Sequence, residues 1–215
     1  MATTDAITIL NDVSRLVLDP EKIVFNNDVL LTFLNAGQVE AVTINPKVNA
    51  VESSVQLAAG IAQSIPSGGI MLLDVKYNTG AAGTSIGAII NKVARSVINK
   101  RLPNWTRESA SGTVKAYIFD ENQPTAFDVY PPQPATGYYV KLVYSKLPTA
   151  IANYNEGTKI TIGDQWANAL MNYVAYRCFS EPGKEFFNPE LRDHYYQHFL
   201  GELGITSSKP SNGSN

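Results

Sequence analysis

The sequence contains few of the residues that metal binding and nucleophilic catalysis usually need. Its 215 residues include one cysteine, Cys178, and two histidines. A lone cysteine cannot form an intrachain disulfide. The chain also opens without the basic and apolar segments of a secretory leader. We therefore expect it to be made and folded in a reducing cytosol.

Charge is scarce as well. Charged residues make up 17% of the chain, the formal net charge is -2, and there is no block of like charges. These values argue against a dedicated reader of nucleic acid, which binds phosphates through clustered Lys and Arg. No apolar run approaches the roughly 20 residues that span a bilayer, so we expect no membrane partner. Such a composition suits a protein that covers much of its surface with neighbouring proteins.

The two histidines have a spacing that metal sites use. His194 and His198 lie four residues apart, so a helix would place both on one face. The residue after His194 is Tyr195, however, and the glutamate of the zinc-protease motif is missing. We therefore expect the pair to pack or to make ring contacts, without a metal.

Other chemical signatures are incomplete. Gly80, Gly83 and Gly87 suggest a loop that could cradle a phosphate, but neither a P-loop nor a dinucleotide fingerprint is present. Cys178 lies in an apolar stretch without a predicted base beside it, which indicates a buried thiol and not a nucleophile. We expect no catalytic residue, no cofactor and no enzymatic activity.

Apolar periodicity predicts a mixed α+β chain. Leu10, Val13 and Val17 repeat at helical spacing, whereas Val140 and Leu142 alternate as in a strand. The expected helices cover about residues 4–18, 27–45, 85–100, 164–180 and 189–203, and the expected β portion covers about 53–77 and 112–146. We interpret the fold as an antiparallel helical bundle with an inserted small antiparallel β-sheet or β-hairpin portion, in a single domain over residues 1–204.

Polar residues mark the expected helix starts. Asn26 or Asn27 can cap the second helix, and Asp164 can cap the fourth. Asn188, followed by a proline, supplies the cap of the last helix.

The last helix has an expected end too. Gly204 can close it in a left-handed conformation. Residues 205–215 are small and polar and cannot bury enough apolar surface to fold alone, so we predict a flexible C-terminal tail.

Several stretches carry a family resemblance. Residues 164–180 read DQWANALMNYVAYRCFS and residues 194–204 read HYYQHFLGELG. Weaker matches are LNAGQ at 34–38, PNW at 103–105 and FDVYPP at 127–132. With the expected order of elements, the chain resembles the head-to-tail adaptor (connector) proteins of podovirus-like and related tailed phages over nearly its whole length.

The resemblance implies a structural virion protein at the head–tail junction, present in the host cytoplasm during assembly. Its subunits would form a homo-oligomer, a dodecameric ring, beneath the portal protein. The next tail component, a nozzle or tail tube, would dock on the ring. Packaged DNA would pass through the channel without sequence-specific binding.

The resemblance also implies which residues make contacts, because related adaptors insert their C-terminal segment between portal subunits. The candidate portal interface comprises Ile205, Thr206, Ser207, Ser208, Lys209 and Pro210. The small, weakly charged loop that is the candidate for ring or tail contacts comprises Asn78, Thr79, Gly80, Gly83 and Thr84.

Two other classes of protein stay open. A tail-associated receptor- or glycan-binding module would use aromatic residues of the strands, although aromatic stripes in strands more often form core. These residues are Tyr117, Phe119, Tyr130, Tyr138, Tyr139 and Tyr144. A virion hydrolase is the less favoured alternative, because no acid, base or nucleophile can be nominated.

Overall fold

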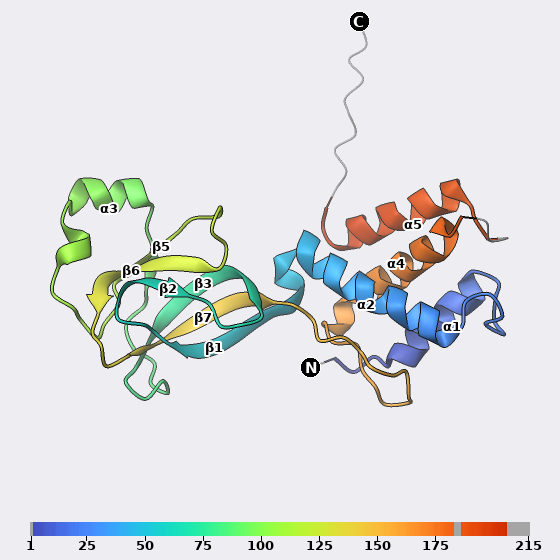
Figure 1. Ribbon diagram of the computed structural model, residues 1–215, viewed down its shortest axis with the longest axis horizontal. Coiled ribbons are helices and arrows are strands. Elements are labelled where there is room, and N and C mark those ends of the chain that lie inside the picture. The colour runs from blue at the N-terminus through green and yellow to red at the C-terminus, as the bar shows by residue number, and fades with distance from the viewer. Residues whose placement is uncertain (1, 183–185, 206–215) are drawn as a thin grey trace, which may run out of the picture. The chain divides into compact units, whose positions relative to one another are not determined.

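The computed structural model describes residues 2–182 and 186–205 (Figure 1). Contacts divide the chain into two compact units. The helical unit comprises residues 1–48 and 148–215, and the sheet unit comprises residues 49–147. A single cooperative domain over residues 1–204 stays a prediction, because a division by contacts does not measure cooperativity; one unfolding transition would support it.

The helical unit is built on α1 (Ala6–Leu16), α2 (Asn27–Ile44), α4 (Ala167–Ser180) and α5 (Pro189–Glu202). Helix α4 contacts the other three. The predicted periodicity holds here, since most apolar positions of α1, α2 and α4 face the shared interior. Its fully buried side chains include Leu10, Val13, Leu30, Leu34, Leu170, Val174 and Phe199.

Close packing in this unit explains one residue of the LNAGQ stretch. A side chain added at Gly37 would place its Cβ 2.7 Å from the Cδ1 atom of Tyr173. Glycine at this position therefore lets α2 approach the aromatic ring of α4.

The structure confirms two of the predicted caps and corrects a third. The Asn26 side chain accepts a hydrogen bond from the Val29 N–H at 3.0 Å, and Asn188 accepts from the N–H groups of Glu190 and Leu191, both at 3.1 Å. Asp164 does not cap α4. A short 3-10 turn precedes that helix, and the Asp164 carboxylate binds backbone groups from the start of the chain instead.

The sheet unit holds two sheets. In the first, β7 (Tyr139–Lys146) lies between β1 (Ala50–Gln56) and β3 (Gly69–Gly80), and both pairings are antiparallel. The second sheet has the order β2-β6-β5-β4. Its strands are β2 (Gly60–Ser64), β6 (Ala126–Gln133), β5 (Ala116–Phe119) and β4 (Asn91–Lys92), and only the β4–β5 pairing is parallel among these described strands.

One apolar core joins the two sheets. It takes Val75, Val140 and Leu142 from the first sheet together with Phe127 and Val129 from the second. The predicted alternation of Val140 and Leu142 is confirmed, since both are buried, as is Tyr144. The α+β class is thus confirmed, but the description as a helical bundle with a small β insertion is not, because the sheets build a compact unit of their own.

The predicted helix at about 85–100 is mostly wrong. Only α3 (Arg95–Arg101) is helical there. Residues 85–90 instead pair with β3, with hydrogen bonds from Asn78 N–H to Ala88 O and from Ile90 N–H to Lys76 O, each 3.0 Å long. This pairing uses the backbone groups that a helix would need.

None of the described helices has the length and apolar character required to cross a membrane.

Candidate assembly surfaces

Hydrogen bonds hold the C-terminal end of α5 in place. Gly204 has φ +80°, which confirms the predicted left-handed end, and the Ile205 N–H donates to Leu200 O at 3.0 Å. The Asn45 side chain, at the end of α2, donates to Leu203 O at 3.0 Å. Ile205 itself is exposed. The other residues of the candidate portal interface, 206–210, lie outside the described residues.

Helix α5 is attached to α4 by aromatic pairs. The ring centroids of Tyr173 and Phe199 lie 5.0 Å apart, and those of Tyr176 and Tyr196 lie 4.8 Å apart. Leu170, Tyr173, Phe199 and Leu203 are buried, whereas Trp166 is only partly buried. The two stretches that carried the family resemblance therefore form one packed helix pair.

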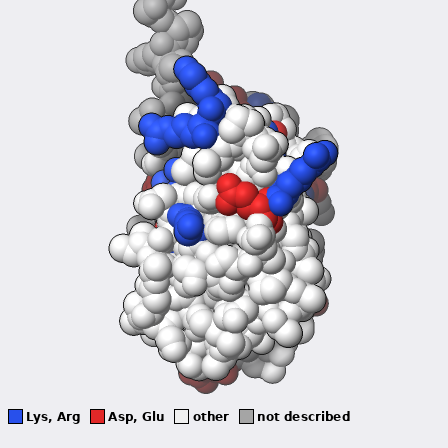
Figure 2. Space-filling model, turned by 90° about the vertical axis from the view of Figure 1, so that its left-hand side faces the viewer, with Lys and Arg blue, Asp and Glu red and all other residues white. Residues whose placement is uncertain are grey.

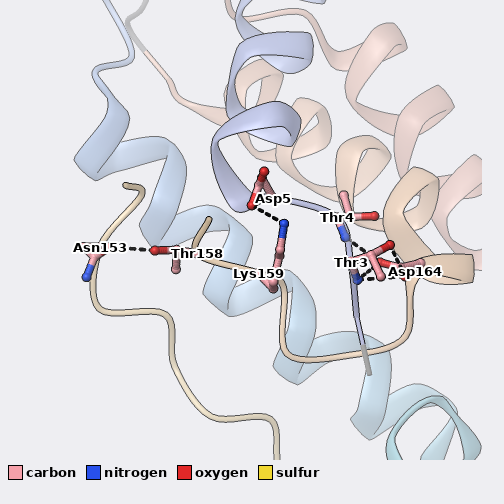
Figure 3. Close-up of polar contacts among 7 residues, drawn as sticks. All are labelled: Thr3, Thr4, Asp5, Asn153, Thr158, Lys159 and Asp164. Carbon is pink, nitrogen blue, oxygen red and sulfur yellow. Dashed lines mark hydrogen bonds and ion pairs between the residues drawn. The ribbon is translucent and has the colours of Figure 1, made fainter. Parts of the chain in front are cut away.

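The start of the chain is bound to the segment before α4 (Figure 3). The Asp164 carboxylate accepts hydrogen bonds from the Thr4 N–H at 2.7 Å and from the Thr3 N–H at 2.8 Å. Hydrogen bonds from Thr4 contribute most, followed by those from Thr3, and together they hold the pKa of Asp164 well below its usual range. Lys159 Nζ lies 2.7 Å from Asp5 Oδ1. Residues 3–5 are thereby fixed beside residues 159–164.

Two polar residues of the LNAGQ stretch also bind a segment distant in sequence. Asn35 accepts a hydrogen bond from the Ile151 N–H at 2.8 Å and donates one to Ile151 O at 3.0 Å. Gln38, which is buried, accepts from the Thr161 N–H at 2.7 Å. These side chains hold the connection between residues 148 and 163 against α2.

The loop between α1 and α2 presents two apolar side chains that sequence reasoning missed. Leu18 is 82% exposed and Ile23 is 84% exposed. The buried Asp19 carboxylate orders the loop by accepting hydrogen bonds from the N–H groups of Ile23, Val24 and Phe25 at 2.9 to 3.1 Å. Leu18 has φ +61°, a conformation that costs a non-glycine residue free energy. The loop is therefore fixed with Leu18 and Ile23 outside.

The candidate ring or tail contact loop divides into a buried and an exposed part. Asn78 and Thr79 are buried, and the Asn78 side chain is bound within the unit to the backbone of Ala88 and Val114. They cannot present side chains to a partner. Gly80 and Gly83 have positive φ values, and Thr84 is exposed.

The exposed part of this loop carries two isoleucines. Ile86 is 83% exposed and Ile89 is 74% exposed. Both lie within the helix predicted over about residues 85–100. The signal that could have corrected this is Gly87, where an added Cβ would lie 2.9 Å from Asn78 O. Whether the loop contacts a partner stays a prediction.

His194, His198 and Cys178 are the residues considered for metal binding or catalysis. They form no reactive arrangement in the described part of the chain. The rings of His194 and His198 lie 4.4 Å apart, yet no described group of three His, Cys, Asp or Glu residues could hold a metal ion. Cys178 is buried. Burial raises the pKa of its thiol to about 12, which keeps it protonated.

Fixed, exposed apolar residues are typical of a structural protein that works through contacts with other proteins. A family model described as SU10 adaptor protein matches residues 4–214, and the chain belongs to this family. It is accordingly a phage structural adaptor protein, a class of virion components and not of enzymes. A comparison with curated proteins gives no match.

Proposed function

We propose that the protein is the subunit of a head-to-tail adaptor ring that links the portal to the tail and extends the DNA channel. The family match over residues 4–214 carries this proposal. The subunits would associate head to tail around a rotation axis, which closes a ring with the same contact repeated at each step. Twelve subunits are the number that the resemblance implies.

The two exposed apolar pairs support a ring of this kind. Leu18 and Ile23 lie on a loop of the helical unit, and Ile86 and Ile89 lie on a loop of the sheet unit. Each loop is held by backbone hydrogen bonds, so little conformational entropy would be lost when a partner covers it. Burying one such side chain contributes about 1.5–3 kcal/mol. In this proposal they contact neighbouring subunits or the next tail component.

The C-terminal segment supports attachment to the portal. Helix α5 is packed on α4, and Asn45 fixes the carbonyl of Leu203 where the helix ends. The exposed Ile205 then starts the segment that, by resemblance, enters the cleft between portal subunits. A pocket for Ile205 and backbone hydrogen bonds would offset the entropy of ordering the segment.

Mixing the purified protein with its portal and imaging the particles by electron microscopy tests the proposal. The expected result is a twelve-fold ring seated on the portal. Particles that carry no added ring at saturating protein concentration would contradict it. A different symmetry would correct the subunit number alone.

The glycan-binding alternative loses part of its basis. Tyr117 and Tyr144 are buried and belong to the core between the sheets, so they cannot stack on a sugar. Phe119, Tyr130 and Tyr139 are partly buried. A tail-tip module would be trimeric or monomeric and would not bind the portal, so the imaging experiment also distinguishes this alternative.

A further inference from the structure

One segment of the sheet unit is basic and lacks acidic residues. Between Asp74 and Glu108 the sequence contains six Lys and Arg residues and no Asp or Glu. Five of the six lie in residues 92–107, here called the basic segment, which includes β4 and α3. They are Lys92, Arg95, Lys100, Arg101 and Arg107.

The basic segment is fixed on the sheet unit. Ile98 and Trp105 are buried and form a small core with Ile118 of β5. The Trp105 Nε1–H donates to Asn99 Oδ1 at 2.9 Å, and the Val93 N–H donates to Tyr117 O at 2.9 Å. The cations therefore project from an ordered support.

Three of these cations have no acidic partner among the described residues. Arg95 pairs with Asp128, and Lys92 lies over the Phe119 ring, 5.3 Å from its centroid. Lys100, Arg101 and Arg107 are exposed and form no described ion pair. They are the remaining cations of the basic segment. Figure 2 shows one side of the molecule, on which several Lys and Arg side chains lie at the surface and a group of Asp or Glu atoms lies beside one of them.

The low net charge of the whole chain gives no sign of this basic surface. Residues 49–147 contain nine Lys and Arg against six Asp and Glu, a balance of +3. The remainder contains eight Lys and Arg against thirteen Asp and Glu, a balance of -5. The total of -2 is the sum of two units of opposite sign.

We propose that the basic segment contacts the phosphate backbone of duplex DNA without reading its sequence. This inference rests on the proposed function, in which DNA passes through the ring. Duplex DNA presents one negative charge per roughly 1.7 Å of its axis, which suits several cations on one short segment without paired carboxylates. Arg101 and Arg107 offer the planar donor groups that match phosphate oxygens.

Two acidic residues of a second copy are already bound within their own unit. Asp19 is buried and bound to backbone N–H groups of its own loop, and Asp164 is bound to Thr3 and Thr4. The charge density of duplex DNA, one negative charge per roughly 1.7 Å of its axis, also exceeds that of the helical unit, whose balance is -5.

The small number of cations has a functional consequence. A few phosphate contacts per subunit give weak, salt-dependent binding that permits sliding. Repetition around a ring would add up these contacts without any single one being strong. The surface would guide DNA along its path and would not hold it.

The test measures binding of a short fluorescent duplex by anisotropy between about 50 and 200 mM salt. The variant K100Q/R101Q/R107Q removes the unpaired cations of the basic segment. The control R15Q/K47Q/K146Q removes the same charge from exposed residues elsewhere. Wild-type protein and control should bind similarly. The slope of log affinity against log salt should be smaller by about 2.7 for the variant, because each phosphate contact contributes about 0.9. Unchanged melting temperatures would show that all three proteins are folded.

Several outcomes would overturn the inference. One is that the wild-type protein does not bind DNA at the lowest salt. Another is that variant and control lose equal DNA affinity, which would indicate diffuse charge. Loss of ring or portal assembly by the variant with intact DNA binding would point to an acidic protein partner instead. Electron microscopy with the portal separates the two proposals: the variant should still form the ring, and a wild-type protein that binds DNA but forms no ring would refute the proposed function alone.

Discussion

The side-chain amide of Asn45 donates a hydrogen bond of 3.0 Å to the carbonyl oxygen of Leu203. The bond connects the end of α2 to the end of α5, 158 residues further along the chain. It satisfies one of the carbonyl groups that a helix end leaves without a partner. It thereby also sets where the C-terminal segment departs.

The substitution Asn45→Ala should destabilise the protein by about 1 kcal/mol, because it removes this hydrogen bond and the one that Asn45 Oδ1 accepts from the Lys47 N–H. Urea denaturation checks the value. Thr43→Ala, at an exposed position of the same helix, is the control and should have a smaller effect. If the direction of departure matters for attachment, Asn45→Ala should also weaken portal binding under conditions where the fold is intact. Equal stability of wild type and Asn45→Ala would show that the bond contributes nothing.

Leu170 is fully buried where α4 packs on its neighbours. Leu170→Ala should cost about 2–5 kcal/mol of unfolding free energy, the lost transfer energy together with the cavity left behind. The measurement is chemical denaturation, with the exposed Asn168→Ala as the control in the same helix. A loss below about 0.5 kcal/mol, the range of ordinary surface substitutions, would contradict the packing described for this helix.

Asp164 should make stability depend on pH. Its pKa is lowered in the folded protein by hydrogen bonds from Thr4 and Thr3. Its contribution is therefore fully present above the unfolded-state pKa of about 3.9 and is lost as the pH falls toward the lower folded-state value. The melting temperature of Asp164→Asn should lie below that of the wild type at neutral pH, and the difference should shrink below about pH 4. A constant difference across this pH range would rule out the linkage.

Ile86 and Ile89 should matter for assembly and not for folding. Because both side chains are exposed, I86S/I89S should change the unfolding free energy by no more than about 0.5 kcal/mol per site. It should weaken ring formation, which analytical ultracentrifugation measures. The control V39S/L147S removes two exposed apolar side chains elsewhere. Unimpaired rings from I86S/I89S would remove the loop from the proposed contacts.

Deleting the residues after Gly204 should leave the melting temperature unchanged and weaken portal attachment. Ordering such a segment costs roughly 1–2 kcal/mol per residue in backbone entropy, which only a partner can offset. Binding to isolated portal rings is the measurement. Undiminished binding by the truncated protein would assign the portal contact to the loops or to the helix faces.

Features set by neighbouring residues could be predicted. The caps at Asn26 and Asn188 require only a side-chain oxygen and an N–H two or three residues later. The left-handed end at Gly204 is equally local. The alternation of Val140 and Leu142 reports a strand with one buried face.

The structure of residues 85–90 and the role of Asp164 were harder to predict, because a local pattern fits more than one structure. Ile86, Ile89 and Ile90 have helical spacing, yet pairing with β3 leaves the first two exposed and buries the third. Asp164 has the place of a cap, but the N–H groups of Thr3 and Thr4 donate to it instead. In both cases a partner distant in sequence supplied hydrogen bonds that replaced the local ones.

The sequence by itself determined which segments of this protein can be helices or strands, where most helices begin, and the family to which the chain is similar. Only the tertiary structure decided that the strands form a compact unit of their own, that Leu18 and Ile86 lie outside, and that the cations of residues 92–107 share one ordered support. The physical reason is the distance along the chain over which each effect acts. Capping and periodicity act within a few residues, whereas burial and charge clustering depend on contacts that close only when the chain has folded.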